Sequence, residues 1–350
     1  MNTTLQAGLI GFGVAGRFFH APLISSTVGL HLAKIVQRHG DEARRAYPEA
    51  AVVNDARAVI EDDAINLVVI ATPNTSHAEL AAQALRAGKH VVVDKPFTIT
   101  SSEAQRLGDE AQTRGRVLSV FHNRRWDADF LTLQRIVQAG MLGRVVEYEA
   151  HFDRFRPQVK AAAWREEDTP GSGILYDLGS HLIDQALCLF GLPRTVRGEL
   201  RRQRDGARAP DYFEVGLGYE ELKVTLKAGM LVREPGPQFI VHGTRGSFLK
   251  HRHEPQENAL RNGLLPLSAD WGRESREQWG TLNTELDGLR YEGKVESVPG
   301  CYQRYYQNVV EAITQGAALA VTAQQACDVI RVIELAMDSD SRGSTLAFAQ

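Results

Sequence analysis

The 350-residue sequence predicts an α/β protein with two domains, the first built on a doubly wound parallel sheet and the second on a large, open, mainly antiparallel sheet. Three observations support this fold class. Apolar strands alternate with helical segments over the first third of the chain. A glycine-rich loop follows the first strand at once. Farther along, apolar and polar residues alternate within single strands. The change of pattern places the boundary near residue 122, so we expect domains at 1–122 and 123–350.

The expected first domain repeats a strand–helix unit, which favours right-handed βαβ connections and a parallel sheet. Residues 65–71, INLVVIA, show no polar alternation, as expected for a strand buried on both faces. The segment 76–88 is helical and ends at a glycine. The other elements are expected as strands at 5–10, 30–36, 90–94 and 116–121, and as helices from the glycine loop to about residue 27 and at 100–114.

The expected second domain has one-sided strands. Residues 222–227, LKVTLK, alternate Leu222, Val224 and Leu226 with polar residues, which is typical of a strand with one buried and one exposed face. Further strands are expected at 144–152, 212–219, 238–243 and 244–248, and helices at 171–191, 302–316 and 323–338. Residues 251–290 are polar and poor in β-formers, so we interpret them as mostly loop.

The composition disfavours several classes of protein. A net charge of −3 gives no general attraction for nucleic acid or an anionic membrane. Cys188, Cys301 and Cys327 lie far apart, which suits a reducing cytoplasm and disfavours a disulfide framework or a thiolate metal site. The start lacks a signal-peptide pattern, and no run approaches the roughly 20 apolar residues that span a bilayer. We therefore expect a cytoplasmic protein without nucleic-acid or membrane partners.

The glycine loop predicts a dinucleotide-binding site. Gly11, Gly13 and Gly16 form G-x-G-x-x-G, and the loop, which includes Val14 and Ala15, follows a strand and opens a helix. The first glycine permits a tight turn, the second lets a pyrophosphate approach the backbone, and the third allows close packing of helix and strand. The helix N-terminus favours the phosphate charge. The alternative is a chance glycine-rich turn, which the repeated strand–helix units disfavour.

The end of the second strand favours NADP over NAD as the cofactor. In this kind of site, NAD is held by an acidic residue that binds the ribose hydroxyls. Here the strand ends Val36-Gln37-Arg38-His39, and the first carboxylate comes only at Asp41. Arg38 can pair with a 2′-phosphate and stack on the adenine. NAD stays possible, because Arg38 can also point into water.

Lys95 lies just after an apolar strand, in HVVVDKPFT (residues 90–98). In doubly wound sheets, ligands bind outside the carboxyl ends of the strands, so this position favours a functional lysine. Pro96 then sets the backbone direction, and an X–Pro bond can adopt the cis form. The alternative is a surface lysine that ends a strand.

The helical segment 171–191 carries polar residues within a largely apolar sequence. Asp177, His181 and Asp184 follow each other at i, i+4 and i+7, which places them on one face of an α-helix. Buried carboxylates and imidazoles are costly unless they are paired or used in chemistry. The structural alternative is an Asp–His pair that ties the helix to its neighbours.

Together, Lys95, Asp177 and His181 suit the oxidation of a secondary alcohol. Histidine titrates near neutral pH, so His181 suits the general base for the hydroxyl proton. Lys95 can stabilise the developing oxyanion, and Asp177 can hold or relay either group. A nicotinamide would take the hydride. No metal is needed, and we interpret His251 and His253 in the polar loop as solvated surface.

Four motifs resemble the Gfo/Idh/MocA family (glucose–fructose oxidoreductase, inositol dehydrogenase and rhizopine catabolism). They are GFGVAG (11–16), ATPNTSH (71–77), DKPFT (94–98) and GSGILYDLGSHLIDQALCLFG (171–191), in this order over nearly the whole chain. The family's usual E-K-P is D-K-P here, which keeps the lysine and the proline. Three further segments resemble one branch of this family, which contains scyllo-inositol dehydrogenases and uncharacterised enterobacterial oxidoreductases. They are FHNRRWD (121–127), HFDRFRP (151–157) and AWRE (163–166).

The resemblance implies a Rossmann domain and an α/β domain whose open sheet often forms dimers, so we expect a homodimer or a tetramer. It also implies that Lys95, Asp177 and His181 match the catalytic set. Beyond the glycine loop and Arg38, the expected cofactor-binding residues are Thr72, Pro73, Asn74, His77, Lys95, Pro96, Trp164 and Arg165. The expected substrate-binding residues are Asn123, Arg124, Asp153, Arg156, Asp177 and His181. For the first four of these, a surface or fold-supporting role is an equal alternative.

The expected function is an NAD(P)-dependent dehydrogenase acting on a secondary alcohol of a polyol, inositol or sugar. Two alternatives stay open. One is an enzyme that uses bound NAD transiently to cleave glycosidic bonds without net redox change. The other is a non-catalytic dinucleotide sensor, against which the retention of all three polar residues argues. The substrate itself is not named by the sequence, because one fold supports many substrates.

Overall fold

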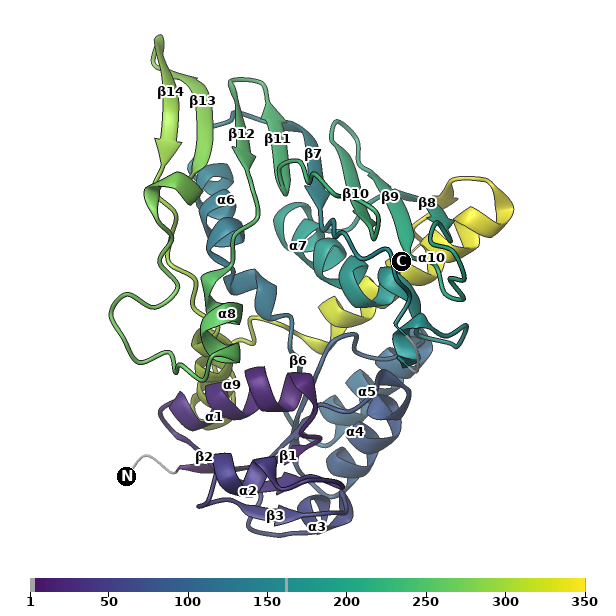
Figure 1. Ribbon diagram of the computed structural model, residues 1–350, viewed down its shortest axis with the longest axis vertical. Coiled ribbons are helices and arrows are strands. Elements are labelled where there is room, and N and C mark those ends of the chain that lie inside the picture. Colours follow the sequence, from purple (N-terminus) through teal and green to yellow (C-terminus); the bar gives the residue numbers. More distant parts are fainter. Residues whose placement is uncertain (1–3, 161–162, 350) are drawn as a thin grey trace. The chain divides into compact units, whose positions relative to one another are not determined.

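The computed structural model describes residues 4–160 and 163–349 and divides the chain into two compact units (Figure 1). Unit 1 consists of Met1–Trp126, Pro255–Trp271 and Cys301–Cys327, and unit 2 consists of Asp127–Glu254, Gly272–Gly300 and Asp328–Gln350. Unit 1 therefore takes in two later segments that a single boundary near residue 122 assigns to the second domain.

Unit 1 contains a six-stranded, parallel sheet in the order β3-β2-β1-β4-β5-β6. Its strands are β1 (Leu5–Ile10), β2 (Leu30–Val36), β3 (Ala51–Val53), β4 (Leu67–Ile70), β5 (His90–Val93) and β6 (Leu118–Val120). The predicted doubly wound sheet is confirmed, and its order reverses between β1 and β4, the point at which such folds bind ligands. Only β3 was not expected, because three residues are too few to show a period.

The helices of unit 1 include two short ones that the sequence pattern did not indicate, α2 (Glu42–Ala46) and α3 (Arg57–Ile60). The others are a π-helical turn η1 (Gly16–His20), α1 (Ala21–Ser26), α4 (His77–Arg86), α5 (Ser101–Thr113), α8 (Pro255–Arg261) and α9 (Gln303–Gln315), with 3-10 turns η2 (Asn74–Ser76) and η3 (Asn123–Trp126). Helix α9 belongs to this unit because Tyr305 and Tyr306 pack on Phe121, with ring centroids 4.9 and 5.9 Å away.

Unit 2 contains a nine-stranded sheet in the order β14-β13-β12-β11-β7-β10-β9-β8-β15. Only β7 and β10 pair in parallel, and the other neighbours are antiparallel, so the predicted mainly antiparallel sheet is confirmed. The strands are β7 (Val145–His151), β8 (Thr195–Arg201), β9 (Tyr212–Gly218), β10 (Lys223–Gly229), β11 (Phe239–Gly243), β12 (Gly246–Lys250), β13 (Gly280–Leu286), β14 (Leu289–Val295) and β15 (Leu346–Ala347).

Residues 251–290, interpreted as mostly loop, also contain α8 (Pro255–Arg261) and β13, which begins a hairpin with β14. Its turn is Asp287-Gly288, with φ angles of 50° and 77°. An Asp-Gly pair is a strong hairpin signal, since both turn residues need positive φ. The signal was hidden because β14 is polar and almost entirely exposed, so it lacks the apolar alternation of a half-buried strand.

One face of the unit 2 sheet is buried by helices and the other is open. Along one row of the register, Tyr148, Val224 and Leu217 lie side by side and are almost fully buried. Figure 1 shows the helices α6 (Ala128–Gln138), α7 (Ser180–Phe190) and α10 (Ala323–Arg342) along the sheet, and Phe190 of α7 meets Tyr148 edge-on. Lys223 is exposed on the other face, which confirms the one-sided pattern of LKVTLK.

Short helical turns complete unit 2. They are the 3-10 turns η4 (Trp164–Glu166) and η6 (Arg276–Gln278) and a π-helical turn, η5 (Leu175–Gly179), that leads directly into α7. Strand β8 was not expected, because Gly198 interrupts its apolar pattern. That glycine is required by packing, since a Cβ there would collide with the backbone of Ala336 in α10.

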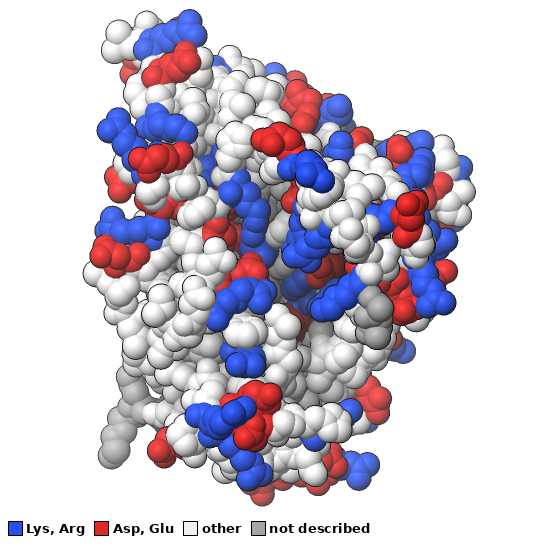
Figure 2. All heavy atoms as spheres, viewed as in Figure 1, with Lys and Arg blue, Asp and Glu red and all other residues white. Residues whose placement is uncertain are grey.

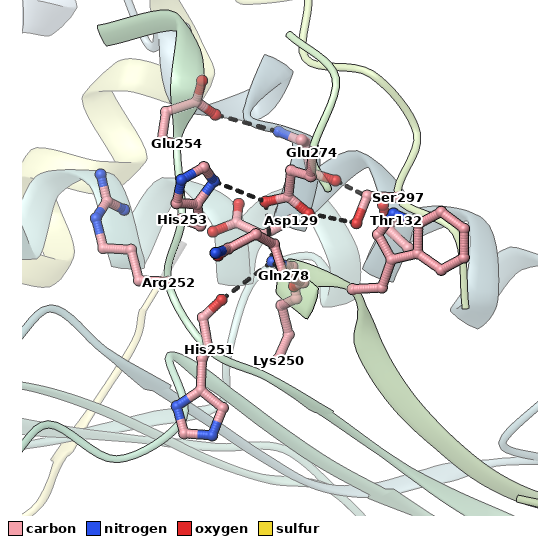
Figure 3. Close-up of polar contacts among 12 residues, drawn as sticks. Asp129, Thr132, Lys250, His251, Arg252, His253, Glu254, Glu274, Gln278 and Ser297 are labelled. Atoms are coloured by element: carbon pink, nitrogen blue, oxygen red, sulfur yellow. Dashed lines mark hydrogen bonds and ion pairs between the residues drawn. The ribbon is translucent and has the colours of Figure 1, made fainter. Parts of the chain in front are cut away.

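Figure 2 shows basic and acidic side chains interspersed over the face in view, so individual clusters matter more than the net charge. Among the described residues, no helix is long and apolar enough to cross a membrane. A polar cluster of unit 2 that includes the buried residues Lys250 and Asp129 is drawn in Figure 3. Its Lys250 ammonium donates to Glu274 (2.9 Å) and to the carbonyl oxygens of Gln278 (2.8 Å) and His251 (3.1 Å).

The two histidines interpreted as solvated surface differ from each other. His251 is exposed, as expected. His253 is half-buried, and its Nδ1 lies 3.9 Å from the Glu274 carboxylate, so it borders the buried cluster.

Candidate active site

The glycine loop has the shape of a dinucleotide cradle. Gly11 has φ = +104°, and a Cβ there would lie 2.5 Å from the carbonyl oxygen of Ala71. A Cβ on Gly16 would collide with the Gly11 carbonyl. Around Gly13, in contrast, a Cβ would meet no atom within 4 Å. The first and third glycines are therefore needed by the fold, and the second leaves open backbone for a ligand, as a pyrophosphate requires.

The turn after β2 presents a cation rather than a carboxylate. The Gln37 side chain is occupied: its Oε1 accepts from the Ala43 N–H (2.8 Å) and its Nε2 donates to the His39 carbonyl (2.9 Å). The Gln37 amide also contacts the Glu42 carboxylate. Arg38 is exposed at this end of the strand. Arg38 is therefore an exposed cation at the position where a cofactor's ribose is expected.

His77 joins the loops that follow β4 and β5. Its ring is 1% exposed, with Nε2 2.9 Å from the Thr72 carbonyl oxygen and Nδ1 3.0 Å from the Pro96 carbonyl oxygen. We expected His77 to touch the cofactor, but both ring nitrogens face backbone carbonyls. The ring therefore lies between the two loops. Thr72 is half-buried, Asn74 is buried and Pro73 is exposed on the first of these loops.

Lys95 lies where the sequence places it, directly after β5, and is half-buried. Its backbone N–H donates to Asp94 Oδ1 (2.9 Å), and the Lys95–Pro96 peptide bond is cis. The glycine loop, the Thr72 loop and Lys95 follow β1, β4 and β5, which are adjacent parallel strands. All three therefore lie at the carboxyl edge of one sheet, next to its switch point.

In unit 2, Asp177 and His181 lie on consecutive elements rather than on one regular α-helix. Asp177 is in the π-helical turn η5 and His181 in the first turn of α7. The expected regular α-helix is therefore interrupted by an i→i+5 turn at Asp177. Such π-bulges occur often at functional sites. His181 is 4% exposed, and its ring stacks on Phe152 at 6.4 Å between centroids.

Asp177 borders a basic cavity of about 220 Å³. Its carboxylate lies 3.4 Å from Arg165 Nε and 3.9 Å from Arg154 Nη1. The Arg165 guanidinium stacks over the Trp164 ring at 4.5 Å. Arg156 also lines the cavity, so four residues singled out from the sequence meet here: Asp177, Trp164, Arg165 and Arg156.

Arg154 is a site residue that the sequence reasoning missed. The segment around it is extended, because the N–H groups of Arg154 and Arg156 donate to the carbonyls of Gly229 and Met230. Alternate residues of an extended segment point to the same side, so choosing Arg156 should have led to Arg154. Asp153 points the other way, where it accepts from the Gly229 N–H (3.0 Å) and lies 3.4 Å from His151.

Three expected substrate-binding residues are buried or held by contacts within the protein. Asp153 accepts the Gly229 N–H of the sheet. Arg124 is 8% exposed and pairs with Glu257 (3.0 Å), and Asn123 beside it is 5% exposed. Their assignment to the substrate stays a prediction.

Two family profiles cover most of the chain. Residues 5–122 match the profile described as "Oxidoreductase family, NAD-binding Rossmann fold". Residues 134–348 match "Oxidoreductase family, C-terminal alpha/beta domain". These are the two domains of the Gfo/Idh/MocA family.

Individual relatives extend over the full length. The chain is 45% identical to the uncharacterized oxidoreductase YdgJ of Escherichia coli, with all of both chains covered. It is 40% identical to scyllo-inositol 2-dehydrogenase (NADP(+)) IolW of Bacillus subtilis, over 98% of this chain and 96% of that protein. Among solved structures, the oxidoreductase yvaA of Bacillus subtilis superposes with a TM-score of 0.96 at 39% identity, covering 100% of this chain and 99% of that one.

Proposed function

The chain belongs to the Gfo/Idh/MocA oxidoreductase family, and on that premise we propose that it is an NAD(P)-dependent dehydrogenase of a polyol, inositol or sugar. One observation carries the proposal: Lys95 follows β5 at the same sheet edge as the glycine loop and the Thr72 loop. A dinucleotide held on the glycine loop would lie at this edge, and Lys95 supplies a cation there.

Each residue has a separate role in the proposed reaction. When bound, the nicotinamide would supply the hydride acceptor. His181 would take the hydroxyl proton as the C–H hydride leaves, which converts the alcohol to a carbonyl. Lys95 would donate to the oxygen as its negative charge develops. Asp177, with Arg165 and Arg154 beside it, orients the substrate hydroxyls.

We propose NADP as the preferred cofactor. Exposed Arg38 and the occupied Gln37 support it, and the relative IolW carries NADP(+) in its name. The test measures dissociation constants for NADP⁺ and NAD⁺ with the native protein and with Arg38→Ala. The substitution is expected to weaken NADP⁺ binding about 10-fold or more, as the loss of one charged contact does, and to leave NAD⁺ binding nearly unchanged. Tighter native binding of NAD⁺ would overturn the preference.

The substrate proposal is a small polyhydroxylated ring, with an inositol as first candidate. The cavity beside Asp177 holds about 220 Å³, below the roughly 300–1,000 Å³ of sites for drug-sized ligands, and its lining is largely polar and charged. The test is a screen of inositols, sugars and polyols with NAD⁺ and NADP⁺ in parallel. Stoichiometric formation of reduced nicotinamide supports the dehydrogenase. Cleavage of a glycoside without net reduction supports the alternative enzyme, and binding without turnover supports the sensor.

We also propose a cytoplasmic homodimer or tetramer. Lys223 is exposed on the face of the unit 2 sheet opposite its buried row, and among the described residues Cys188, Cys301 and Cys327 form no disulfide. Sedimentation at micromolar concentration is expected to show a species larger than the 38.7 kDa monomer. A monomer alone under these conditions would overturn the assembly proposal.

A further inference from the structure

We propose that His20, held by Tyr306 and acting through the Asp94 carboxylate, is a positioning residue for Lys95. The inference rests on the function proposed above, because it concerns the lysine that faces the reacting oxygen in that function. All four residues belong to unit 1.

Close polar contacts link the four residues, and the step from His20 Nε2 to Asp94 is a 3.5 Å contact rather than a hydrogen bond. His20 Nδ1 lies 2.6 Å from the Tyr306 hydroxyl, and His20 Nε2 lies 3.5 Å from Asp94 Oδ1. The same Asp94 oxygen accepts the Lys95 backbone N–H at 2.9 Å. One carboxylate oxygen therefore joins the imidazole to the backbone of Lys95.

The chain is built in the interior of the unit. His20 and Tyr306 are 0% exposed, and the His20 ring packs on Phe121 with centroids 4.3 Å apart. The side chains of His20, Asp94 and Tyr306, which are far apart in the sequence, are thus buried together. Burying a polar group costs free energy unless the group has a partner or a use in chemistry. His20 is also the last residue of the π-helical turn η1, a local geometry that is frequent at functional sites.

The Asp94 carboxylate stays ionised in this environment. Burial alone would raise its pKa, but His20, Lys95 and His77 outweigh burial, and the pKa of Asp94 is lowered from its ordinary value. Tyr305 and Tyr306 are the other titratable groups near this carboxylate. An ionised acceptor makes a shorter and stronger hydrogen bond to a backbone N–H than a neutral one.

Lys95 is consequently held from both sides. Asp94 fixes its N–H, and His77 lies 3.0 Å from the carbonyl oxygen of Pro96, the next residue. A displacement of about 1 Å in a reacting group can lower a rate roughly 100-fold, so this anchoring matters for the reaction. Loss of His20 removes a neighbour that helps to keep Asp94 ionised, and we expect it to loosen the first of the two anchors.

The first test needs no substrate. Lysines of the native protein are reductively ¹³C-methylated, and the Lys95 NMR signal is assigned by its absence in Lys95→Arg. His20→Asn and Tyr306→Phe are expected to move the Lys95 signal, while the signal of exposed Lys223 stays in place. Tyr305→Phe is the matched control, because its hydroxyl bonds Ser119 (3.0 Å) rather than His20. An unmoved Lys95 signal in folded His20→Asn and Tyr306→Phe overturns the inference.

The second test measures turnover of scyllo-inositol with NADP⁺. His20→Asn and Asp94→Asn are expected to lower kcat roughly 10- to 100-fold with little change in the cofactor KM. Asp94→Glu keeps the carboxylate and is expected to recover most of the rate. In a Lys95→Ala background, His20→Asn should have no further effect, because residues acting through one group are non-additive.

The outcomes separate the two proposals. Native turnover by Lys95→Ala overturns the proposed function. Loss of turnover by Lys95→Ala together with native turnover by His20→Asn overturns only the positioning role. If His20→Asn does not fold, Tyr306→Phe and the Asp94→Asn and Asp94→Glu pair carry the same comparison.

Discussion

Each unit buries a charged cluster, and the two clusters hold their central aspartates in opposite states. In unit 1, the pKa of Asp94 is lowered. In unit 2, burial and the neighbouring Asp127 raise the pKa of Asp129 from 3.8 to about 7. Both carboxyl groups are almost fully shielded from solvent, at 9% and 0% exposure of the residue. Burial therefore does not decide the charge of either group.

The difference lies in the partners. Asp94 faces His20 and accepts the Lys95 N–H. Asp129 accepts only the N–H of Phe130 (2.7 Å) through Oδ1, and its Oδ2 has no hydrogen-bond partner among the described residues. The nearby Lys250 is directed to Glu274, as Figure 3 shows. A buried carboxyl group stays ionised when hydrogen-bond donors and favourable charges are directed at it, and burial pushes it toward the neutral form when these are used elsewhere.

The largest expected change in the free energy of unfolding comes from Lys250→Met. The substitution leaves Glu274 as a fully buried carboxylate without its cation, a change that typically costs about 3–5 kcal/mol. Urea unfolding measures the loss. Lys223→Met, on the exposed side of β10, is the control and should stay within about 0.5 kcal/mol of the native protein. A loss below about 1 kcal/mol for Lys250→Met would contradict the assigned role of the pair.

The next effect is a change in the pH dependence of stability with Asp129→Asn. The unfolded chain releases this proton near pH 3.8, and the folded protein releases it near pH 7. The native free energy of unfolding therefore falls as pH rises between these values. The asparagine variant should lose this fall and exceed the native protein at pH 8 by about 2–4 kcal/mol. Parallel pH curves for the two proteins would contradict the raised pKa.

Asp94→Asn should show the opposite sign. The pKa of Asp94 is lowered, so its ionised form stabilises the folded protein above the ordinary value of 3.8, and this contribution disappears as pH falls below it. The variant is expected to lose about 1–3 kcal/mol at pH 7, the worth of a hydrogen bond to a charged group. The loss should shrink toward pH 3. A loss independent of pH would indicate a packing defect instead.

The smallest expected losses of stability come from the removal of single hydroxyl groups. Tyr306→Phe leaves His20 Nδ1 without its 2.6 Å partner, so a loss of about 1–2 kcal/mol is expected. Ser297→Ala removes a contact of Glu274 but leaves Lys250 in place, and the loss should stay below about 1 kcal/mol. Thermal unfolding of both variants checks the order. A larger loss for Ser297→Ala than for Tyr306→Phe would contradict the expected order.

Local sequence patterns predicted the main architecture of both units. The unbroken apolar run at 67–70 lies in the centre of the parallel sheet, and the alternation at 223–229 follows the buried and open faces of the second sheet. The glycine loop and Lys95 could be placed at strand ends because the period of a strand and the position of its end are local properties. For the same reason, the Asp177 and His181 segment was found, although its π-helical turn was not.

The contacts between distant segments were decided by the tertiary structure alone. His20 and Tyr306 are 286 residues apart, and no local period predicts that they share a hydrogen bond. The assignment of α9 to unit 1 likewise follows from the packing of Tyr305 and Tyr306 on Phe121. The charge of a buried aspartate depends on which cation reaches it in space. Sequence therefore determined which residues end the strands, and the fold determined which of them are paired, because pairing is set by three-dimensional distance.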